Sequence, residues 1–254
     1  MSIEYIIHLS DIHIRLQSRR DEYEHVFKNL YEKLDNYKNK NGLIVITGDI
    51  FHDKTTLSPE AIKLSLDFFE ELSNRYPTIL IHGNHDGLLN VESRMNNISG
   101  VLFKKSFKNL HYLKNSGIYQ FNYILFGLSS LDDDILLKSE ELDEYILTHN
   151  LKDVIKVGLH HGMVGTIELE CLYKVKGKYS VNDFLGYDYV LLGDVHKYQY
   201  LNESKTIGYA SSLISQNFSE TDNNHGFLYW DLKALSSHYE IIRNDYRYKV
   251  CNLN

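Results

Sequence analysis

The sequence predicts an α/β protein of four layers, α/β/β/α, in which two mixed β-sheets pack face to face and helices cover the outside. Two observations predict this architecture. Short apolar runs rich in Ile, Val and Leu alternate with segments of helical spacing, and the second half of the chain adds shorter, aromatic, alternating runs. The five apolar runs are residues 5–9, 43–47, 78–82, 154–159 and 189–192.

The five apolar runs are predicted to be β-strands that are buried on both faces. They are too short for helices, and they lack the alternation of a strand with one face in water. Each run stops at a cluster of Asp, His or Asn. In open α/β sheets, ligands bind outside the carboxyl ends of the strands. We therefore expect the five polar clusters to converge on one rim.

Helical segments are predicted between the strands, as parallel pairing requires. The first follows Arg19 and Arg20, carries apolar residues at helical spacing from Tyr23 to Tyr37, and ends at the polar residues 39–42.

The second predicted helix is marked more clearly, because Ser58 can cap it and Pro59 fits its first position. It carries two apolar stripes, and two stripes need two partners. The helix either lies between the sheet and a neighbouring segment or presents a homodimer face. One stripe is Ile62, Leu66, Phe69 and Leu72, and the other is Leu57, Leu64 and Phe68.

The runs beyond Gly100 are shorter and richer in aromatic residues, which favours a mixed two-sheet sandwich over one parallel sheet. These strands are predicted around residues 119–121, 123–128, 207–209, 227–232 and 239–242.

Bulk composition is that of one globular domain over residues 1–254 in a reducing compartment. Cys171 and Cys251 make no disulfide framework, and no signal peptide or membrane span is visible, so we expect an intracellular location in cytoplasm, nucleoid or nucleus. The formal net charge of −7 disfavours nucleic-acid binding. Two bound divalent ions would add +4 to the −7 and leave −3, which weakens that objection.

The polar clusters contain seven residues of the types that bind divalent metal ions. Two Asp-x-His pairs can each chelate an ion, since along extended backbone both side chains share one face. Asp49 can bridge two ions, because each carboxylate oxygen can face a different metal. Such ions lie about 3.5–4 Å apart in hydrolytic sites, and the water between them would be the nucleophile. The seven are Asp11, His13, Asp49, Asn84, His160, Asp194 and His196.

His85 follows a candidate ligand and is suited to a different task. Attack on phosphorus expels an alkoxide, which is a poor leaving group unless it is protonated. A His beside the metals can deliver that proton, and Asp86 could orient it.

These motifs, in this order, resemble the calcineurin-like metallophosphoesterase superfamily over nearly the whole chain. Residues 48–52, 83–86, 212–218 and 225–231 are similar to the nuclease subunit of the DNA double-strand-break repair complex, called SbcD in bacteria and the meiotic recombination eleven nuclease in eukaryotes. The resemblance implies His85 as the general acid. It also implies one manganese on Asp11, His13, Asp49 and His196, and another on Asp49, Asn84, His160 and Asp194.

Two positions refine this resemblance. Protein phosphatases usually have Asp at the position of His52 and Glu at the position of Asp86. Both differences favour the nuclease branch. The resemblance implies that His52 lies beside the site and helps to position the strand. Most members have His where this chain has Asp194, and the extra carboxylate should shift preference towards Mn²⁺ or Mg²⁺ and away from zinc.

The segment 173–179 interleaves three lysines with flanking tyrosines, and two further cationic residues adjoin ligands. Such a pattern can track a phosphate backbone and stack a base. It also fits an exposed, solvated hairpin. The candidate DNA contacts are Arg15, Lys174, Lys176, Lys178 and Lys197.

The sequence therefore predicts a two-metal DNA nuclease of repair or recombination, with exonuclease activity on duplex ends and endonuclease activity on single strands. The alternatives are a phosphodiesterase acting on small or cyclic nucleotides and a non-enzymatic scaffold, which the retained His85 and ligand set disfavour. No P-loop motif occurs, so ATP dependence would come from an ATPase partner. Because the chain stops at Asn254, we expect it to lack the family's DNA-capping and ATPase-binding regions. Cleavage polarity and the preferred DNA end stay open.

Overall fold

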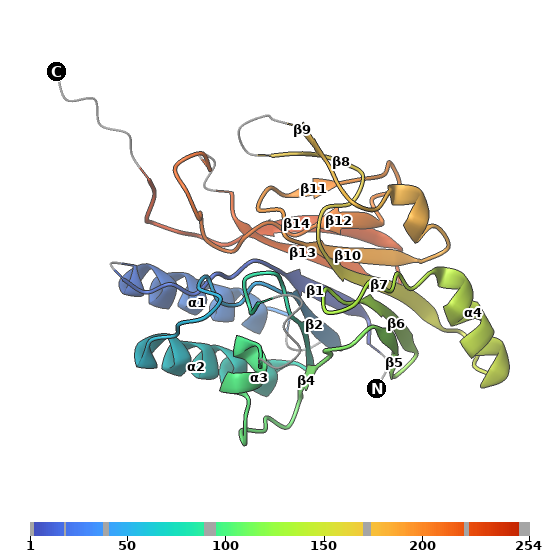
Figure 1. Cartoon of the computed structure of the whole chain (residues 1–254), viewed down its shortest axis with the longest axis horizontal. Coiled ribbons are helices and arrows are strands. Elements are labelled where there is room, and N and C mark those ends of the chain that lie inside the picture. Colours follow the sequence, from blue (N-terminus) through green and yellow to red (C-terminus); the bar gives the residue numbers. More distant parts are fainter. Residues whose placement is uncertain are drawn as a thin grey trace.

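Two six-stranded β-sheets lie face to face in the computed structural model, which describes residues 3–17, 19–37, 41–88, 95–169, 174–220 and 224–248 (Figure 1). Helices cover the outer face of each sheet. The two sheets hold an apolar core between them, and a further core lies under the helices of the first sheet. The predicted α/β/β/α architecture is confirmed.

The first sheet has the strand order β14-β13-β1-β2-β3-β4. Strands β1 to β4 are parallel, whereas β13 pairs antiparallel with β1 and β14 antiparallel with β13. The strands are β1 (Tyr5–Leu9), β2 (Gly42–Thr47), β3 (Thr78–Ile81), β4 (Leu110–Tyr112), β13 (Gly226–Asp231) and β14 (Ser236–Ile241).

The second sheet has the order β11-β12-β10-β7-β6-β5, with parallel pairing from β6 through β7 and β10 to β12 and antiparallel edge strands. All five predicted apolar runs are strands. The strands are β5 (Gly117–Phe121), β6 (Ile124–Ser129), β7 (Ile155–His161), β10 (Tyr189–Gly193), β11 (Gln199–Tyr200) and β12 (Ile207–Tyr209).

A separate hairpin of β8 (Thr166–Glu168) and β9 (Lys174–Lys176) lies over the second sheet, followed by the short 3-10 helix η1 (Val181–Phe184) (Figure 1). Tyr173, which the sequence places in the lysine-rich segment, lies outside the described residues, as do Cys171 and Cys251.

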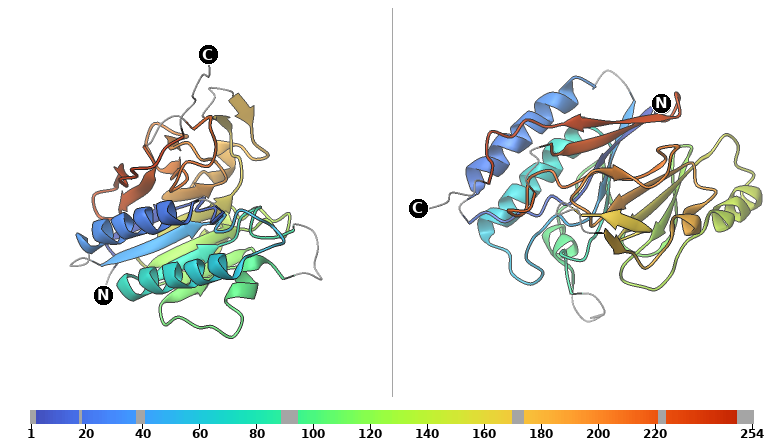
Figure 2. Two further views of the ribbon diagram at one scale, coloured as in Figure 1. Left: turned by 90° about the vertical axis from the view of Figure 1, so that its left-hand side faces the viewer. Right: turned by 90° about the horizontal axis from the view of Figure 1, so that it is seen from above.

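Helices α1 (Arg20–Asp35) and α2 (Pro59–Arg75) run side by side on the outer face of the first sheet (Figure 2). The Ser58 hydroxyl accepts a hydrogen bond from the amide of Ala61 at 3.1 Å, so the predicted cap is present. Helix α4 (Ser139–Thr148) contacts β6 and β7 on the other side of the molecule, and the short α3 (Asn97–Val101) precedes β4. Among the described residues, no helix combines the length and the apolar character that a membrane span requires.

The second apolar stripe of α2 packs against α1. Phe68 is fully buried, and its ring stacks on Phe27 of α1 with centroids 4.3 Å apart. Leu64 packs against the same core. The stripe thus finds its partner inside the chain, as the first of the two interpretations predicts. The homodimer stays a prediction.

Replacing Phe68 with Ala should lower the free energy of unfolding by about 3–5 kcal/mol, because the cavity left between the helices can collapse only partly. Urea unfolding followed by circular dichroism measures this loss. Phe103→Ala is the matched control, since its ring is 63% exposed and the change should stay within about 0.5 kcal/mol. Equal losses in the two variants would contradict the packing of α2 on α1.

Candidate metal centre

The predicted polar clusters meet where the carboxyl ends of strands from both sheets come together. Strands β1, β2 and β3 deliver residues from the first sheet, and β7 and β10 deliver residues from the second. The side chains brought together are Asp11, His13, Asp49, Asn84, His85, His161, Asp194 and His196.

Four of these residues have left-handed backbone conformations, which residues other than glycine rarely adopt. The φ angles are +52° at Asp11, +48° at His13, +53° at Asp49 and +88° at Asp194. The prediction that the Asp-x-His pairs lie on extended backbone is therefore wrong. Tight turns bring the side chains together, and the amides of Asp11 and His13 fix one turn by donating to the carbonyls of Gly48 and Asp49, at 3.1 and 2.9 Å. Backbone strain of this kind gathers at functional sites.

Asp49 lies at the middle of the cluster. Its Oδ2 is 3.4 Å from Nε2 of His13 and 3.4 Å from Nε2 of His161. Its Oδ1 accepts a hydrogen bond from the amide of His85 at 2.8 Å. Asp49 thus separates two groups of potential ligands and touches both, which is the position that a bridging carboxylate needs.

The first group joins β1 to β10. His196 Nε2 lies 3.0 Å from Nε2 of His13 and 3.9 Å from Oδ1 of Asp11. The Asp194 amide donates to the Asp11 carboxylate at 3.2 Å. Asp11, His13 and His196 therefore have donor atoms close enough together to hold one ion.

His161, and not His160, enters the cluster from β7. His161 Nε2 is 3.9 Å from Oδ1 of Asp194. His160 faces the other way: its Nδ1 lies 2.8 Å from the Ser129 carbonyl, and its ring packs edge-on against Tyr179. Successive residues of a strand point to opposite faces, so only one of the two can reach the centre. The sequence-based choice of His160 is corrected at this point: His161 is the residue of β7 that lies beside the carboxylates and is the candidate ligand.

Three glycines make room for the His161 ring. A Cβ atom at Gly48, Gly83 or Gly193 would lie 2.6 Å from an atom of this ring, closer than real Cβ atoms come. Gly48 also has a φ of +94°. These glycines belong to the motifs that carry the resemblance, but the sequence does not show which histidine they enclose.

The donor atoms fit divalent cations. Asn84 Oδ1 and His161 Nε2 are buried and have no hydrogen-bond partner among the described residues. Leaving such atoms unpaired is costly unless a ligand takes them up. Asp11 and Asp49 are buried carboxylates that lie nearby. Two carboxylate-lined groups that share Asp49, each containing buried histidine nitrogen, are suited to two divalent ions.

The pKa values at the centre show how strongly the buried acids attract positive charge. Burial raises the pKa of Asp11 to about 6. Burial also disfavours the charged form of Asp49, but the attraction of His161 outweighs it and lowers the Asp49 pKa below its ordinary value. Burial lowers the pKa of His196, but the Glu220 and Asp11 carboxylates outweigh it and raise that pKa to about 9. The carboxylates that raise the pKa of His196 would also attract metal cations.

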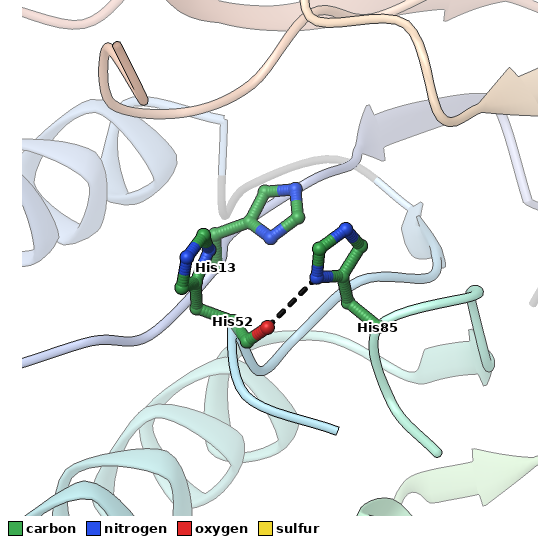
Figure 3. Close-up of side chains that lie close together, drawn as sticks. All are labelled: His13, His52 and His85. Carbon is green, nitrogen blue, oxygen red and sulfur yellow. Dashed lines mark hydrogen bonds between the residues drawn. The ribbon is translucent and has the colours of Figure 1, made fainter. Parts of the chain in front are cut away.

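The carbonyl of His52 orients His85. His85 Nδ1 donates to this carbonyl at 2.7 Å, and the ring stands edge-on to His13 with centroids 4.9 Å apart (Figure 3). The second ring nitrogen of His85 is therefore the one available to a substrate. Burial and the nearby Arg15 guanidinium lower the pKa of His52, so this side chain stays neutral beside the centre.

Asp86 does not contact His85 in the way that the sequence suggested. Its Oδ1 accepts from the amide of Phe51 and its Oδ2 from the amide of Gly83, each at 2.9 Å. It is fully buried, and burial raises its pKa to about 7. Asp86 holds the loops after β2 and β3 together, and the orienting role predicted for it belongs to the His52 carbonyl.

Glu220 is a site residue that sequence reasoning missed. Its Oε1 lies 2.9 Å from Nδ1 of His196, and its Oε2 accepts a hydrogen bond from the backbone amide of Gln216 at 2.6 Å. Its side chain is fully buried. A carboxylate on the far nitrogen of a ligating histidine fixes the ring and raises its basicity. No local motif marks Glu220, because its partner lies 24 residues away.

Of the predicted DNA contacts, Arg15 reaches the centre. Its Nη1 is 3.3 Å from Nε2 of His52. Lys178 pairs with Asp134 at 2.8 Å and Lys197 with Glu168 at 2.5 Å. The remaining two, Lys174 and Lys176, are exposed on β9.

The model of the calcineurin-like phosphoesterase family matches residues 5–198. The chain belongs to this family. Its centre is therefore that of a metal-dependent phosphoesterase. The chain is also 42% identical over 250 residues to an uncharacterized protein of Acanthamoeba polyphaga mimivirus. That alignment covers 97% of this chain but 18% of the viral protein, so the chain spans less than a fifth of its relative's length.

Replacing His161 with Asn should remove one of two bound metal ions, whereas His160→Asn should keep both. The reason is that only His161 points at the carboxylates. Metal content after dialysis against Mn²⁺ can be counted by inductively coupled plasma mass spectrometry. Loss of an ion from the His160 variant alone would restore the sequence-based assignment.

Glu220→Gln should weaken the affinity for metal at the His196 group by about 10- to 100-fold, since the histidine loses its charged partner. Calorimetric titration with Mn²⁺ measures this change. Glu203→Gln, an exposed position, serves as the control. Unchanged affinity in Glu220→Gln would mean that Glu220 only supports its loop.

Proposed function

We propose that the chain is a two-metal DNA nuclease of repair or recombination, acting as an exonuclease on duplex ends and an endonuclease on single strands. One observation supports the proposal: three of the four segments that resemble the nuclease subunit, residues 48–52, 83–86 and 212–218, supply contacts at the centre or beside it. The His52 carbonyl orients His85, and the Gln216 carbonyl accepts a hydrogen bond from Arg15. An ATPase partner belongs to the same proposal.

The ligand residues divide into two sets that share Asp49. When bound, two divalent ions supply Lewis acidity towards the phosphate and lower the pKa of water. We propose Mn²⁺, with Mg²⁺ as the substitute, because carboxylate oxygens make up much of the set. Asp11, His13, Asp49 and His196 would hold one ion, and Asp49, Asn84, His161 and Asp194 the other.

The remaining residues act on the substrate. Hydrolysis breaks one P–O bond: water loses a proton to the solvent and adds its oxygen to phosphorus, and the leaving alkoxide takes up a proton. His85 is held through Nδ1, so its Nε2 would give that proton. Arg15, beside His52, would bind a phosphate oxygen of the strand.

His85→Gln should lower kcat on end-labelled duplex and single-stranded DNA by about 10²–10⁴-fold and leave the metal content unchanged, because it removes a proton donor and no ligand. His111→Gln, an exposed histidine, is the control. If the wild-type protein with Mn²⁺ hydrolyses bis(p-nitrophenyl) phosphate and cyclic nucleotides but cleaves no DNA, the function is the small-nucleotide phosphodiesterase.

Asp194→His should narrow the advantage of Mn²⁺ over Zn²⁺, since it replaces a hard oxygen ligand by nitrogen and removes a negative charge. The measurement is the ratio of kcat/KM for bis(p-nitrophenyl) phosphate with each metal. An unchanged ratio would show that Asp194 does not set the metal preference.

A further inference from the structure

A hollow of about 530 Å³ lies beside the metal centre. Three separate parts of the chain form it: the segment that leads from Arg15 into α1 as far as Glu22, the loop of residues 215–218, and residues 246–248. Its volume falls in the range of about 300–1,000 Å³ that is usual for small-molecule sites. The residues that matter for its chemistry are Arg15, Arg19, Phe218 and Tyr248.

Arg15 brings an uncompensated positive charge to this hollow. Its Nη1 lies 3.3 Å from His52, and its Nη2 donates to the Gln216 carbonyl and, at 3.2 Å, to the Tyr248 hydroxyl. None of these partners is an acid, and within the described parts of the chain no carboxylate forms an ion pair with Arg15. Its Nε is buried without a partner. An anion is therefore the natural ligand of this guanidinium.

Arg19 stabilises the wall of the hollow. Its Nε pairs with Glu22 at 2.8 Å, and its Nη2 donates to the Ser215 carbonyl at 2.7 Å. Its guanidinium carbon lies 5.5 Å from the centre of the Tyr248 ring. Arg19 thus fixes the loop and the tyrosine. Arg15, which has no acidic partner among the described residues, is available to a ligand, and the exposed Arg247 adds a further positive charge to the lining.

Two aromatic rings complete the hollow. Phe218 is 63% exposed, and its ring centre lies 4.5 Å from that of Tyr248. The exposed Phe218 ring, supported by the partly buried Tyr248, offers a stacking surface beside a guanidinium that has no acidic partner among the described residues. Bases stack on such rings whatever their identity, because every base has a π-face.

We propose that this hollow is a nucleotide subsite in which Arg15 binds the phosphate and the Phe218–Tyr248 pair stacks the base. The Arg15 guanidinium connects the metal centre to the hollow, since it contacts His52 at the centre and Tyr248 in the hollow. The role of the subsite rests on the proposed nuclease function: it would hold the nucleotide next to the cleaved phosphodiester.

This assignment has a consequence for the form of the substrate. A base in the interior of a duplex is covered on both faces by its neighbours, so a base that stacks on Phe218 has left the stack or lies at its end. The subsite therefore favours single strands and frayed ends over the interior of a duplex.

The test compares two phosphates that differ only in the base. Thymidine 5′-monophosphate and deoxyribose 5-phosphate are titrated calorimetrically into the Mn²⁺-loaded protein, which needs no catalytic activity. The nucleotide should bind roughly 5- to 150-fold more tightly, as expected for one stacked base. Phe218→Ala should reduce this ratio to below about threefold, since the stacking surface is lost. Phe103→Ala, equally exposed at 63%, should keep the wild-type ratio.

Equal affinity of the wild-type protein for the two phosphates, or a ratio that survives in Phe218→Ala, would overturn the subsite. Arg15→Gln should lower the affinity for both phosphates by the same factor. A loss of affinity for the nucleotide alone would contradict the role of Arg15. The nuclease proposal is tested separately, by cleavage of DNA. If the protein binds the nucleotide more tightly than the sugar phosphate but cleaves no DNA, the subsite stands and the nuclease proposal is wrong. If it cleaves DNA but binds the two phosphates equally, only the subsite is wrong.

Discussion

The burial of the Asp11 and Asp49 carboxylates, next to the partly exposed Asp194, is the constraint that shapes this molecule. Asp11 and Asp49 lie almost out of reach of water, and Asp194 stands close to both groups of ligands. Such charges are tolerated only when cations or hydrogen-bond donors face them. Backbone amides of His85 and Asp194 supply part of this compensation, and the histidines supply more. Divalent ions would supply the rest. The two apolar sheets stabilise the strained turns that hold the acids in place.

Much of the fold could be predicted because its signals are local. Each buried apolar run is a strand whose pattern stands in its own residues, and the Ser58-Pro59 start of α2 depends on neighbours in sequence. The meeting of the polar clusters at one rim could be predicted for a related reason. Strand ends gather at one rim in this class of fold, so polar residues that follow strands are brought together without knowledge of their exact contacts.

What could not be predicted depends on contacts between distant segments. Whether His160 or His161 faces the carboxylates is decided by how β7 aligns with β6 and β10, and a shift of one residue reverses it. The orienting carbonyl of His52 and the carboxylate of Glu220 act from other loops. The partner of the second α2 stripe could not be predicted either, because an apolar stripe shows that a helix face is covered but not which segment covers it.

The loop of residues 215–220 serves two neighbours at once. Glu220 holds the ring of His196, and four residues earlier the Gln216 carbonyl holds Arg15, with Phe218 between them. The Gln216 amide in turn donates to Glu220, so the two ends of the loop are tied together. A single short segment is thus shared by a metal ligand and by a wall of the adjacent hollow. Thermodynamic reciprocity then applies: if occupancy of the hollow changes the affinity for the ion at His196 by some factor, that ion changes the affinity of the hollow by the same factor.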